Sequence, residues 1–434
     1  MAGSRPPPLD PTPALARSAS SSFAFEGEVH AATAGDSLAE ALWAAGIWQL
    51  GRSPKYHRPR GAFCFSGSCG TCLLRVNGRP NVRACMEPVS AALRCERQNA
   101  FPAADVDLLR AADWLFPHGM DHHHLMTGTR VGNALFVKLV REVGGTGVVP
   151  DEPDPRFGAT EILQVDVCVV GAGPAGLSSA AAVAEGQAGR RVLLLDQRSG
   201  SGGSWRSEAG GRARAEAAER RLRALGVDVA LASTVFGYFP EDHLPASSPA
   251  FDGPPGVLAV LRPQHVTLVS ARRFVLATGS YEQNLAFPGN DRPGIVAARA
   301  CGRLLLDRGI VPARRVTLVM DPAAPWDYGE RLRATLDAAG VTTDTVSLAQ
   351  APAPRKHHAL AIVARPAPAF ELPRQFGVEV QHDPARGGFF AAVGPEGRTS
   401  VPGVFVAGDA CGYVGPEYAE AHGRAVGRCV GSSL

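Results

Sequence analysis

Four cysteines lie close together in the sequence with the spacing C-x4-C-x2-C-x12-C. They are Cys64, Cys69, Cys72 and Cys85. A plant-type [2Fe–2S] cluster needs such an arrangement, because one loop supplies three thiolate ligands and a fourth returns from elsewhere. Zinc modules usually show two separated C-x2-C pairs, and disulfides need an oxidising compartment that no export signal indicates. The spacing therefore predicts a [2Fe–2S] cluster.

The chain around these cysteines explains how the fourth one returns. Asn77-Gly78 follows the third cysteine after a short apolar run, and Asn-Gly is a strong hairpin signal because both residues tolerate positive φ. Folding back at this turn brings Cys85 beside the loop. The remaining cysteines are scattered and are interpreted as core thiols: Cys95, Cys168, Cys301, Cys411 and Cys429.

A glycine-rich turn between two apolar runs forms the second candidate site. A predicted buried strand, 165–170, leads into Gly171-Ala172-Gly173-Pro174-Ala175-Gly176, a helix over 177–184 and a strand over 191–195 that ends in Asp196. In a dinucleotide-binding βαβ unit the first glycine makes the turn, the second lets the pyrophosphate approach, and the third allows close helix packing. The helix N-terminus supplies amides for phosphate, and the acid lies at the right distance for a ribose hydroxyl.

Two later motifs favour FAD over NAD in this site. A strand over 274–276 ends in Ala277-Thr278-Gly279, and a strand over 404–406 leads through Ala407 to Gly408-Asp409. In two-dinucleotide flavoproteins the first motif crosses near the adenylate, and the second places its aspartate on the ribityl–phosphate arm. The helix predicted over 418–430 can then point its N-terminus at the flavin pyrimidine. Gly203 completes the predicted FAD-binding residues, and NAD stays open as the alternative occupant.

A second nucleotide fingerprint is missing where a pyridine-nucleotide reductase would carry one. A predicted strand over 316–320 and a helix over 329–339 flank Asp321-Pro322-Ala323-Ala324-Pro325-Trp326-Asp327, which leaves no glycine turn for a pyrophosphate. We therefore expect a degenerate NAD-like subdomain, which argues against an NADH–ferredoxin reductase. No C-x2-C lies near the flavin motifs, which argues against a disulfide reductase.

Composition limits the class of protein. The chain has 434 residues, 45% hydrophobic and 20% charged, with a net charge of +3. These values predict a globular protein of two or three domains and argue against nucleic acid as a main partner. The sequence contains no run of 18 apolar residues, so no membrane span is predicted. The Pro-, Ser- and Ala-rich start has no apolar signal segment, so we expect a cytoplasmic protein.

The predicted fold class is α/β, with a β-grasp [2Fe–2S] ferredoxin-like domain followed by a two-dinucleotide-binding, Rossmann-like flavoprotein domain. Ser37 and Glu40 form a capping-box pattern that starts the helix of the first domain. His122-His123-His124 is interpreted as a solvated loop, and a helix is predicted over 133–143. The expected boundaries are a disordered leader (1–21), the cluster domain (22–95), a linker (96–160), the first FAD-binding segment (161–300), the NAD-like subdomain (301–373) and the second FAD-binding segment (374–434).

The string G-R-S-P-K-Y-H-R-P-R-G at 51–61 resembles the N-terminal domain of the heterotetrameric sarcosine oxidase α subunit. That family includes hydrogen cyanide synthase, opine oxidase and proline/hydroxyproline dehydrogenase subunits, and residues 277–283 and 287–294 are similar to the same proteins. The positive charges of the string allow two interpretations. They can lie near the cluster and favour its reduced state, or the string can form a solvated loop or a domain interface.

The resemblance implies the protein's role. In such complexes a separate FAD-dependent, amine-oxidising subunit does the chemistry, FMN can lie at the subunit interface, and electrons pass to a downstream acceptor. The resemblance thus implies an electron-transfer subunit of a heteromeric amine or imino-acid oxidoreductase, with catalytic residues unknown. The sequence stops just after the helix that follows Gly408-Asp409, before the folate-handling region of sarcosine oxidase α subunits or the cysteine-rich domain of other relatives, so we expect neither folate use nor a second cluster. Two alternative functions stay open. One is a stand-alone oxidoreductase, and the other is a structural nucleotide-binding subunit with NAD in the dinucleotide site.

Overall fold

The structure is a computed structural model. It describes residues 19–53, 56–100, 103–108, 111, 129–132, 134–135, 158, 160–186, 189–240, 253–263, 265–321, 326–355 and 357–434. The predicted leader up to residue 18, the histidines at 122–124 and most of the predicted helix 133–143 lie outside these residues. The chain forms two compact units, Met1–Pro153 with Asn284–Ala364, and Asp154–Gln283 with Arg365–Leu434.

The first unit contains a five-stranded mixed sheet in the order β2-β1-β7-β5-β6. Its elements are β1 (Ser21–Phe25), β2 (Glu28–Ala32), α1 (Leu38–Ala44), β3 (Gly51–Arg52), β4 (Pro59–Arg60), β5 (Leu73–Val76), β6 (Arg79–Arg83) and β7 (Arg94–Glu96). Asn77 and Gly78 both have positive φ and join β5 to β6, which confirms the predicted hairpin. Ser37 and Glu40 form both hydrogen bonds of the capping box that starts α1.

The first unit also contains a four-stranded parallel sheet in the order β15-β18-β16-β17. Its elements are β15 (Ile295–Ala297), α6 (Ala298–Leu306), β16 (Arg315–Met320), α7 (Tyr328–Ala338), β17 (Thr342–Ser347), η4 (Leu348–Gln350) and β18 (His358–Val363). The buried Trp326 and Tyr328 stack with ring centroids 4.9 Å apart at the start of α7. Two aromatic rings therefore lie where a nucleotide-binding unit would carry its glycine turn.

The second unit is built on a seven-stranded sheet in the order β10-β9-β8-β13-β12-β11, with β22 also paired to β13. β13 is long, so its first half pairs with β12 and its second half with β22. The main elements are β8 (Glu161–Val170), α4 (Pro174–Gly186), β9 (Val192–Leu195), η2 (Gly203–Ser207), α5 (Gly211–Ala224), β10 (Asp228–Ala230), β11 (Thr234–Phe239), β12 (Val257–Leu261), β13 (Val266–Leu276), β22 (Val404–Val406), η7 (Gly408–Cys411) and α9 (Pro416–Ser432). The smaller elements are β14 (Ser280–Tyr281), β19 (Ala367–Pro368), α8 (Glu371–Gln375), β20 (Val380–Asp383), η5 (Pro384–Arg386), β21 (Gly388–Ala391) and η6 (Pro395–Gly397).

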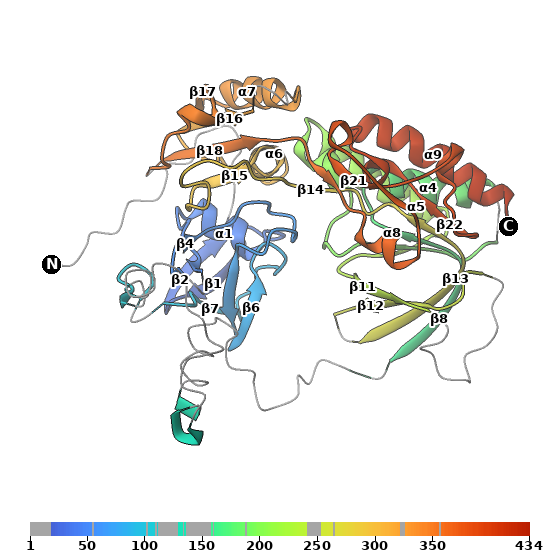
Figure 1. Ribbon diagram of the computed structural model, residues 1–434, viewed down its shortest axis with the longest axis horizontal. Coiled ribbons are helices and arrows are strands. Elements are labelled where there is room, and N and C mark those ends of the chain that lie inside the picture. The colour runs from blue at the N-terminus through green and yellow to red at the C-terminus, as the bar shows by residue number, and fades with distance from the viewer. Residues whose placement is uncertain are drawn as a thin grey trace. The chain divides into compact units, whose positions relative to one another are not determined.

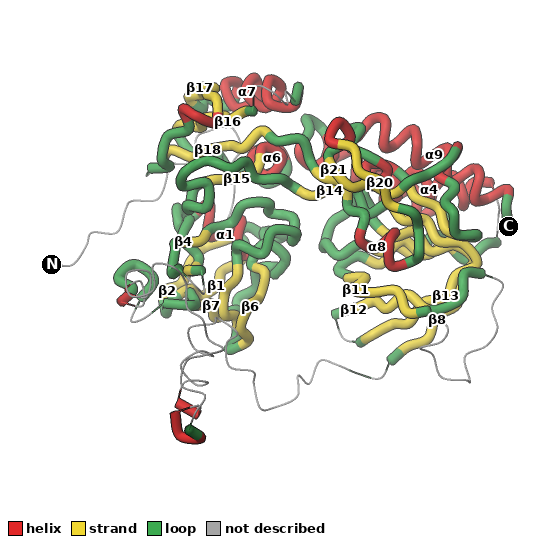
Figure 2. The backbone as a smooth tube through the Cα atoms, in the orientation of Figure 1, coloured by secondary structure: helices red, strands yellow, loops and turns green. Residues whose placement is uncertain are grey.

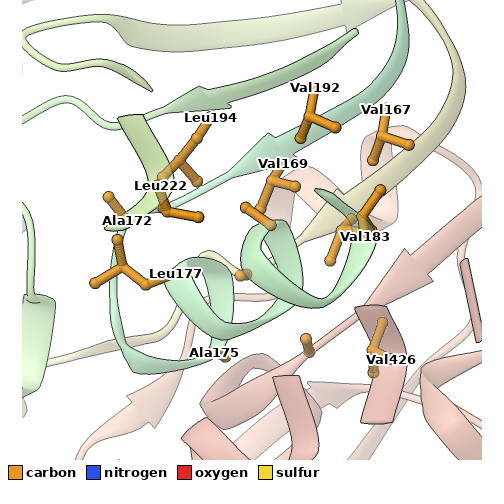
Figure 3. Close-up of a cluster of buried hydrophobic side chains, with 14 of the residues drawn as sticks. Val167, Val169, Ala172, Ala175, Leu177, Val183, Val192, Leu194, Leu222 and Val426 are labelled. Carbon is orange, nitrogen blue, oxygen red and sulfur yellow. The ribbon is translucent and has the colours of Figure 1, made fainter. Parts of the chain in front are cut away.

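Helices α4 and α9 lie side by side against this sheet (Figures 1 and 2). A Cβ on Gly423 would lie 2.1 Å from the carbonyl oxygen of Ala175, and one on Gly427 would lie 2.4 Å from that of Ser179. The two helices can approach this closely only because α9 has no side chains at these positions. The core between them and the sheet contains Val169 and Leu194 from strands, Leu177 from α4 and Val426 from α9 (Figure 3).

The described elements confirm the predicted α/β class. β9 and the second half of β8, from Val167 on, consist of buried apolar residues, as expected for parallel strands covered on both faces. No helix among the described residues is long and apolar enough to cross a bilayer.

Candidate functional site

The four cysteines of the predicted cluster site lie together in the first unit. Cys64, Cys69 and Cys72 occupy the loop between β4 and β5, and Cys85 follows directly after β6. Three of the thiols are buried and that of Cys69 is half-buried, and none forms a disulfide. The β5–β6 hairpin therefore returns the fourth cysteine to the loop, as its turn residues predict.

The four thiols interact as a connected series. Cys69 hydrogen-bonds to Cys64, Cys64 to Cys85, and Cys85 to Cys72. The bond from Cys69 holds the pKa of Cys64 well below its usual value, and the bond from Cys85 lowers the pKa of Cys72. The proton-bearing partners shift the other way, because the bonds to Cys64 raise the pKa of both Cys69 and Cys85.

This arrangement suits a binuclear cluster. Within the described ranges, no three His, Cys, Asp or Glu side chains converge on a single metal ion. The four thiols form one connected series, and four cysteine thiolates are the ligand set of a [2Fe–2S] centre. The residues present therefore fit the predicted cluster, which would be held by Cys64, Cys69, Cys72 and Cys85.

The loop backbone is fixed by several neighbours. Phe65 has φ 48° and Gly67 has φ 81°, so the loop turns sharply after the first cysteine. The Arg83 Nη1 donates to the carbonyl oxygen of Gly67 at 2.7 Å, and the amide of Ser66 donates to the Cys64 sulfur at 3.3 Å. Amide donors aimed at sulfur stabilise charge on the thiolate, so the loop conformation is suited to its expected ligand role.

The basic string at 51–61 divides into a buried and an exposed portion. His57 is 1% exposed and its Nδ1 lies 3.0 Å from the buried carboxylate of Asp107, while the Arg52 Nε lies 3.4 Å from the same carboxylate. Arg60 instead pairs with Asp291 at 2.9 Å, and Arg58 reaches the same carboxylate at 4.0 Å. These ion pairs join the described part of the string to Asp107 and Asp291 within the first unit.

The predicted dinucleotide turn lies between β8 and α4 in the second unit. A Cβ on Gly171, which has φ 106°, would lie 2.2 Å from the Ala277 carbonyl oxygen, and a Cβ on Gly176 would lie 1.7 Å from the carbonyl oxygen of Gly171. A Cβ on Gly173 would meet only Gly203 Cα, at 3.9 Å. The first and third glycines are therefore required by packing, whereas Gly173 leaves open space above its backbone.

These features form a cradle that a side chain would fill. Gly203 has φ 50° and faces Gly173 across the turn. Pro174 begins α4 with its φ already suited to a helix, and Ala175 follows in the first turn, so the free amides of the helix end lie at the turn. The turn therefore fits the pyrophosphate of a dinucleotide.

Asp196 lies at the end of β9 beside the turn. Its Oδ2 accepts a hydrogen bond from the Ala172 amide at 2.7 Å and its Oδ1 accepts one from the Arg198 amide at 2.8 Å. Each carboxylate oxygen keeps a second lone pair, so these bonds leave capacity for a ribose hydroxyl. The structure adds a role that the motif does not reveal, because the carboxylate ties β9 to the glycine turn.

The two later motifs lie at the ends of β13 and β22. Ala277 continues β13, and the Thr278 hydroxyl donates to the Ala369 carbonyl oxygen at 2.7 Å, with Gly279 at φ 75° directly after it. Asp409, beside Gly408, is 5% exposed and accepts bonds from the Ser280 hydroxyl and from two amides that precede α9. The aspartate thus fixes the turn that leads into α9.

His422 is a site residue that the motifs did not indicate. Its Nδ1 accepts a hydrogen bond from the Gly408 amide at 3.2 Å, and burial lowers its pKa. The neutral ring therefore holds the glycine of the Gly-Asp motif against α9. The sequence signal that could have indicated this role is a histidine six residues after the start of the helix that follows the Gly-Asp motif.

Comparisons with known proteins agree with this geometry. Residues 18–100 match the 2Fe-2S iron-sulfur cluster binding domain, and residues 169–228 match the NAD(P)-binding Rossmann-like domain. The alpha subunit of sarcosine oxidase from Rhizobium meliloti (strain 1021) is 33% identical over 334 residues, which are 74% of this chain and 33% of that protein. An opine oxidase subunit from Agrobacterium tumefaciens (strain Ach5) is 27% identical over 60% of this chain and 64% of that protein.

A solved structure shares the fold across both units. L-proline dehydrogenase from P. horikoshii matches with a TM-score of 0.68 and 20% identity, covering 95% of this chain and 73% of that one. The chain spans about a third of the length of the sarcosine oxidase α subunit that it matches. With its [2Fe–2S] cluster binding domain and Rossmann-like dinucleotide-binding domain, the chain resembles the family of sarcosine oxidase α, hydrogen cyanide synthase and opine oxidase subunits.

Proposed function

We propose that this chain is the iron–sulfur flavoprotein subunit of a heteromeric amine or imino-acid oxidoreductase. It relays electrons from a partner flavoprotein subunit, which oxidises a substrate of the sarcosine, proline or hydroxyproline, opine or glycine type, to a downstream acceptor. The observation that carries the proposal is the combination, in one chain, of a four-thiol site with a glycine turn that has open space above Gly173. When bound, a flavin accepts an electron pair and releases single electrons, which suits it to a one-electron cluster.

The residues around the dinucleotide site support FAD as the occupant. Asp409 lies at the end of the strand–turn that precedes α9, and the helix begins at Pro416 after Gly415. The amide end of that helix offers a partial positive charge, which stabilises negative charge on a reduced flavin ring. Gly171, Gly173 and Gly176 would admit the pyrophosphate, and Asp196 would bind the adenosine ribose.

The first unit supports an electron-transfer role rather than hydride uptake from NADH. Trp326 is 6% exposed and Tyr328 is 2% exposed, and their stacked rings occupy the start of α7. The pyrophosphate of NADH would need backbone amides at that helix end. The four thiols lie in the same unit, so the unit is suited to hold a one-electron carrier.

The test is to purify the full chain with and without its co-expressed partner subunit. We expect the chain alone to carry flavin absorption, iron and sulfide, and to oxidise small amines only with the partner present. Robust amine oxidation by the chain alone would refute the relay role. A protein that carries NAD in place of flavin would refute the FAD assignment, and one that lacks both flavin and iron would refute the proposal as a whole.

A further inference from the structure

The segment Asn284–Ala364 makes direct contacts with the cluster loop inside the first unit. The amide of Ala297, which precedes α6, donates to the carbonyl oxygen of Phe63 at 3.0 Å. A Cβ on Gly61 would lie 3.1 Å from the Pro293 Cα, so the loop entry passes close to the same segment. The segment that resembles a nucleotide-binding subdomain therefore serves as a support for the cysteine loop.

A buried cation on α6 contacts the loop. Arg303 lies on α6 and is 6% exposed, and its Nη1 donates to the carbonyl oxygen of Phe65 at 2.8 Å. Phe65 directly follows Cys64 and has φ 48°, a conformation that a bulky residue rarely adopts without support. The guanidinium thus holds the strained residue beside the first thiol and places positive charge next to it.

Arg308, which follows α6, is placed differently. The Arg308 Nε lies 3.1 Å from a carboxylate oxygen of Glu40 and 3.5 Å from one of Asp307, so two acids compensate its charge. Their charges raise the pKa of Arg308 in spite of its burial. Arg308 fastens α1 to the segment, whereas Arg303 contacts the neutral carbonyl of the cysteine loop. The two arginines therefore support the loop through different contacts, Arg308 through α1 and Arg303 through the loop backbone.

A positive charge at this place has a defined consequence. Four thiolates and two sulfides leave a [2Fe–2S] centre with net negative charge, and reduction adds to it. Charges interact strongly where water is excluded, so a buried guanidinium one residue from a ligand favours the reduced state. We propose that Arg303 is a positioning residue that raises the reduction potential of the cluster, an inference that depends on the cluster of the proposed function.

The experiment is a redox titration of the full chain, followed by electron paramagnetic resonance of the reduced cluster. We expect Arg303→Gln and Arg303→Met to lower the ratio of reduced to oxidised cluster about tenfold at a fixed potential, which equals ~59 mV for a one-electron couple. Arg303→Lys keeps the charge and should retain most of the wild-type potential. Arg308→Met is the matched control, and we expect it to lower the thermal unfolding temperature without shifting the potential.

The outcomes distinguish this inference from the proposed function. A wild-type chain without iron, sulfide or a resonance signal would overturn the proposed function itself. A cluster that titrates at the same potential in wild type and in Arg303→Met would overturn the role of Arg303. If Arg303→Met fails to hold a cluster, the Lys and Gln variants decide, since equal potentials in those two would show that the charge has no influence.

Discussion

Replacing Gly176 with alanine tests the dinucleotide turn most directly. The added Cβ would lie 1.7 Å from the carbonyl oxygen of Gly171, and the neighbouring Ala277 Cβ is 3.3 Å away. The two nearest atoms, the carbonyl oxygen and carbonyl carbon of Gly171, belong to the backbone, and the alanine Cβ has no rotatable bond, so no flexible side chain can move aside. The turn and the start of α4 must separate by roughly 1.7 Å to restore an ordinary contact of about 3.4 Å.

The expected cost follows from this displacement. Overpacking a well-packed region costs about 1–3 kcal/mol, and a clash with backbone belongs in the upper range of these values. The second unit has about 200 residues, for which 1 kcal/mol lowers the unfolding temperature by about 2–4 °C. We therefore expect Gly176→Ala to lower the unfolding temperature of this unit by about 4–12 °C and to lose the bound dinucleotide.

Two matched alanine substitutions separate packing from binding. At Gly173 the new Cβ would meet only Gly203 Cα, at 3.9 Å, so the fold should be kept while the space for the pyrophosphate is filled. We expect Gly173→Ala to bind dinucleotide at least tenfold more weakly, about 1.4 kcal/mol, with an unchanged unfolding temperature of the stripped protein. At Gly186, near the exposed end of α4, a Cβ meets nothing within 4 Å, so Gly186→Ala should match wild type in both measurements.

The assay is differential scanning calorimetry of stripped protein, together with titration of the stripped protein with FAD and with NAD. The reasoning would be wrong if Gly176→Ala unfolded at the wild-type temperature, because the geometry allows no cheap relaxation. Wild-type affinity in Gly173→Ala would show that the dinucleotide does not approach the turn at this glycine. Preference for NAD over FAD would instead leave the turn in place and change its occupant.

Three further outcomes are expected. Cys69→Ser should lose iron, sulfide and the cluster signal while it keeps the dinucleotide. The control Cys429→Ser, at a buried cysteine outside the cluster site, should keep the iron, the sulfide, the signal and the dinucleotide. Stoichiometric iron in Cys69→Ser would contradict the ligand assignment. Burial lowers the pKa of His422, so its stabilising contribution is complete above the ordinary histidine pKa of about 6.5 and is lost as the pH falls below that value. Thermal unfolding should therefore depend less on pH in His422→Asn, whose side-chain oxygen can still accept from the Gly408 amide, and equal dependence would count against this view. Anaerobic NADH should leave the flavin oxidised while dithionite reduces it, and bleaching by NADH would show a second nucleotide site.

The features that could be predicted from the sequence are those with a local physical cause. Asn77-Gly78 forms its turn because both residues accept positive φ, and Ser37 starts α1 by bonding a free amide of the first turn. The glycine turn was recognisable because each glycine is required by a different close contact, as the structure shows at Gly171 and Gly176. Such patterns involve neighbours in the chain, so one sequence suffices to find them.

The features that were not predicted depend on contacts between distant segments of the chain. Arg303 contacts Phe65 across 238 positions, and nothing near either residue indicates the other. Asp196 was expected at a ribose and also bonds the Ala172 amide, because the end of β9 lies beside the turn only in the folded sheet. His422 supports Gly408 through a helix whose packing depends on the glycines of α9.

The aromatic pair at the start of α7 adds apolar burial to the segment of the first unit that contacts the cysteine loop. Trp326 and Tyr328 bury rings of about 150–250 Å² each, and at about 25 cal/mol per Å² each ring contributes roughly 4–6 kcal/mol of apolar burial. Opening this region for a pyrophosphate would cost that burial and would still require a glycine turn. Because the aromatic pair packs at this helix end without a ligand, the contact between Arg303 of α6 and the Phe65 carbonyl oxygen does not require a bound nucleotide.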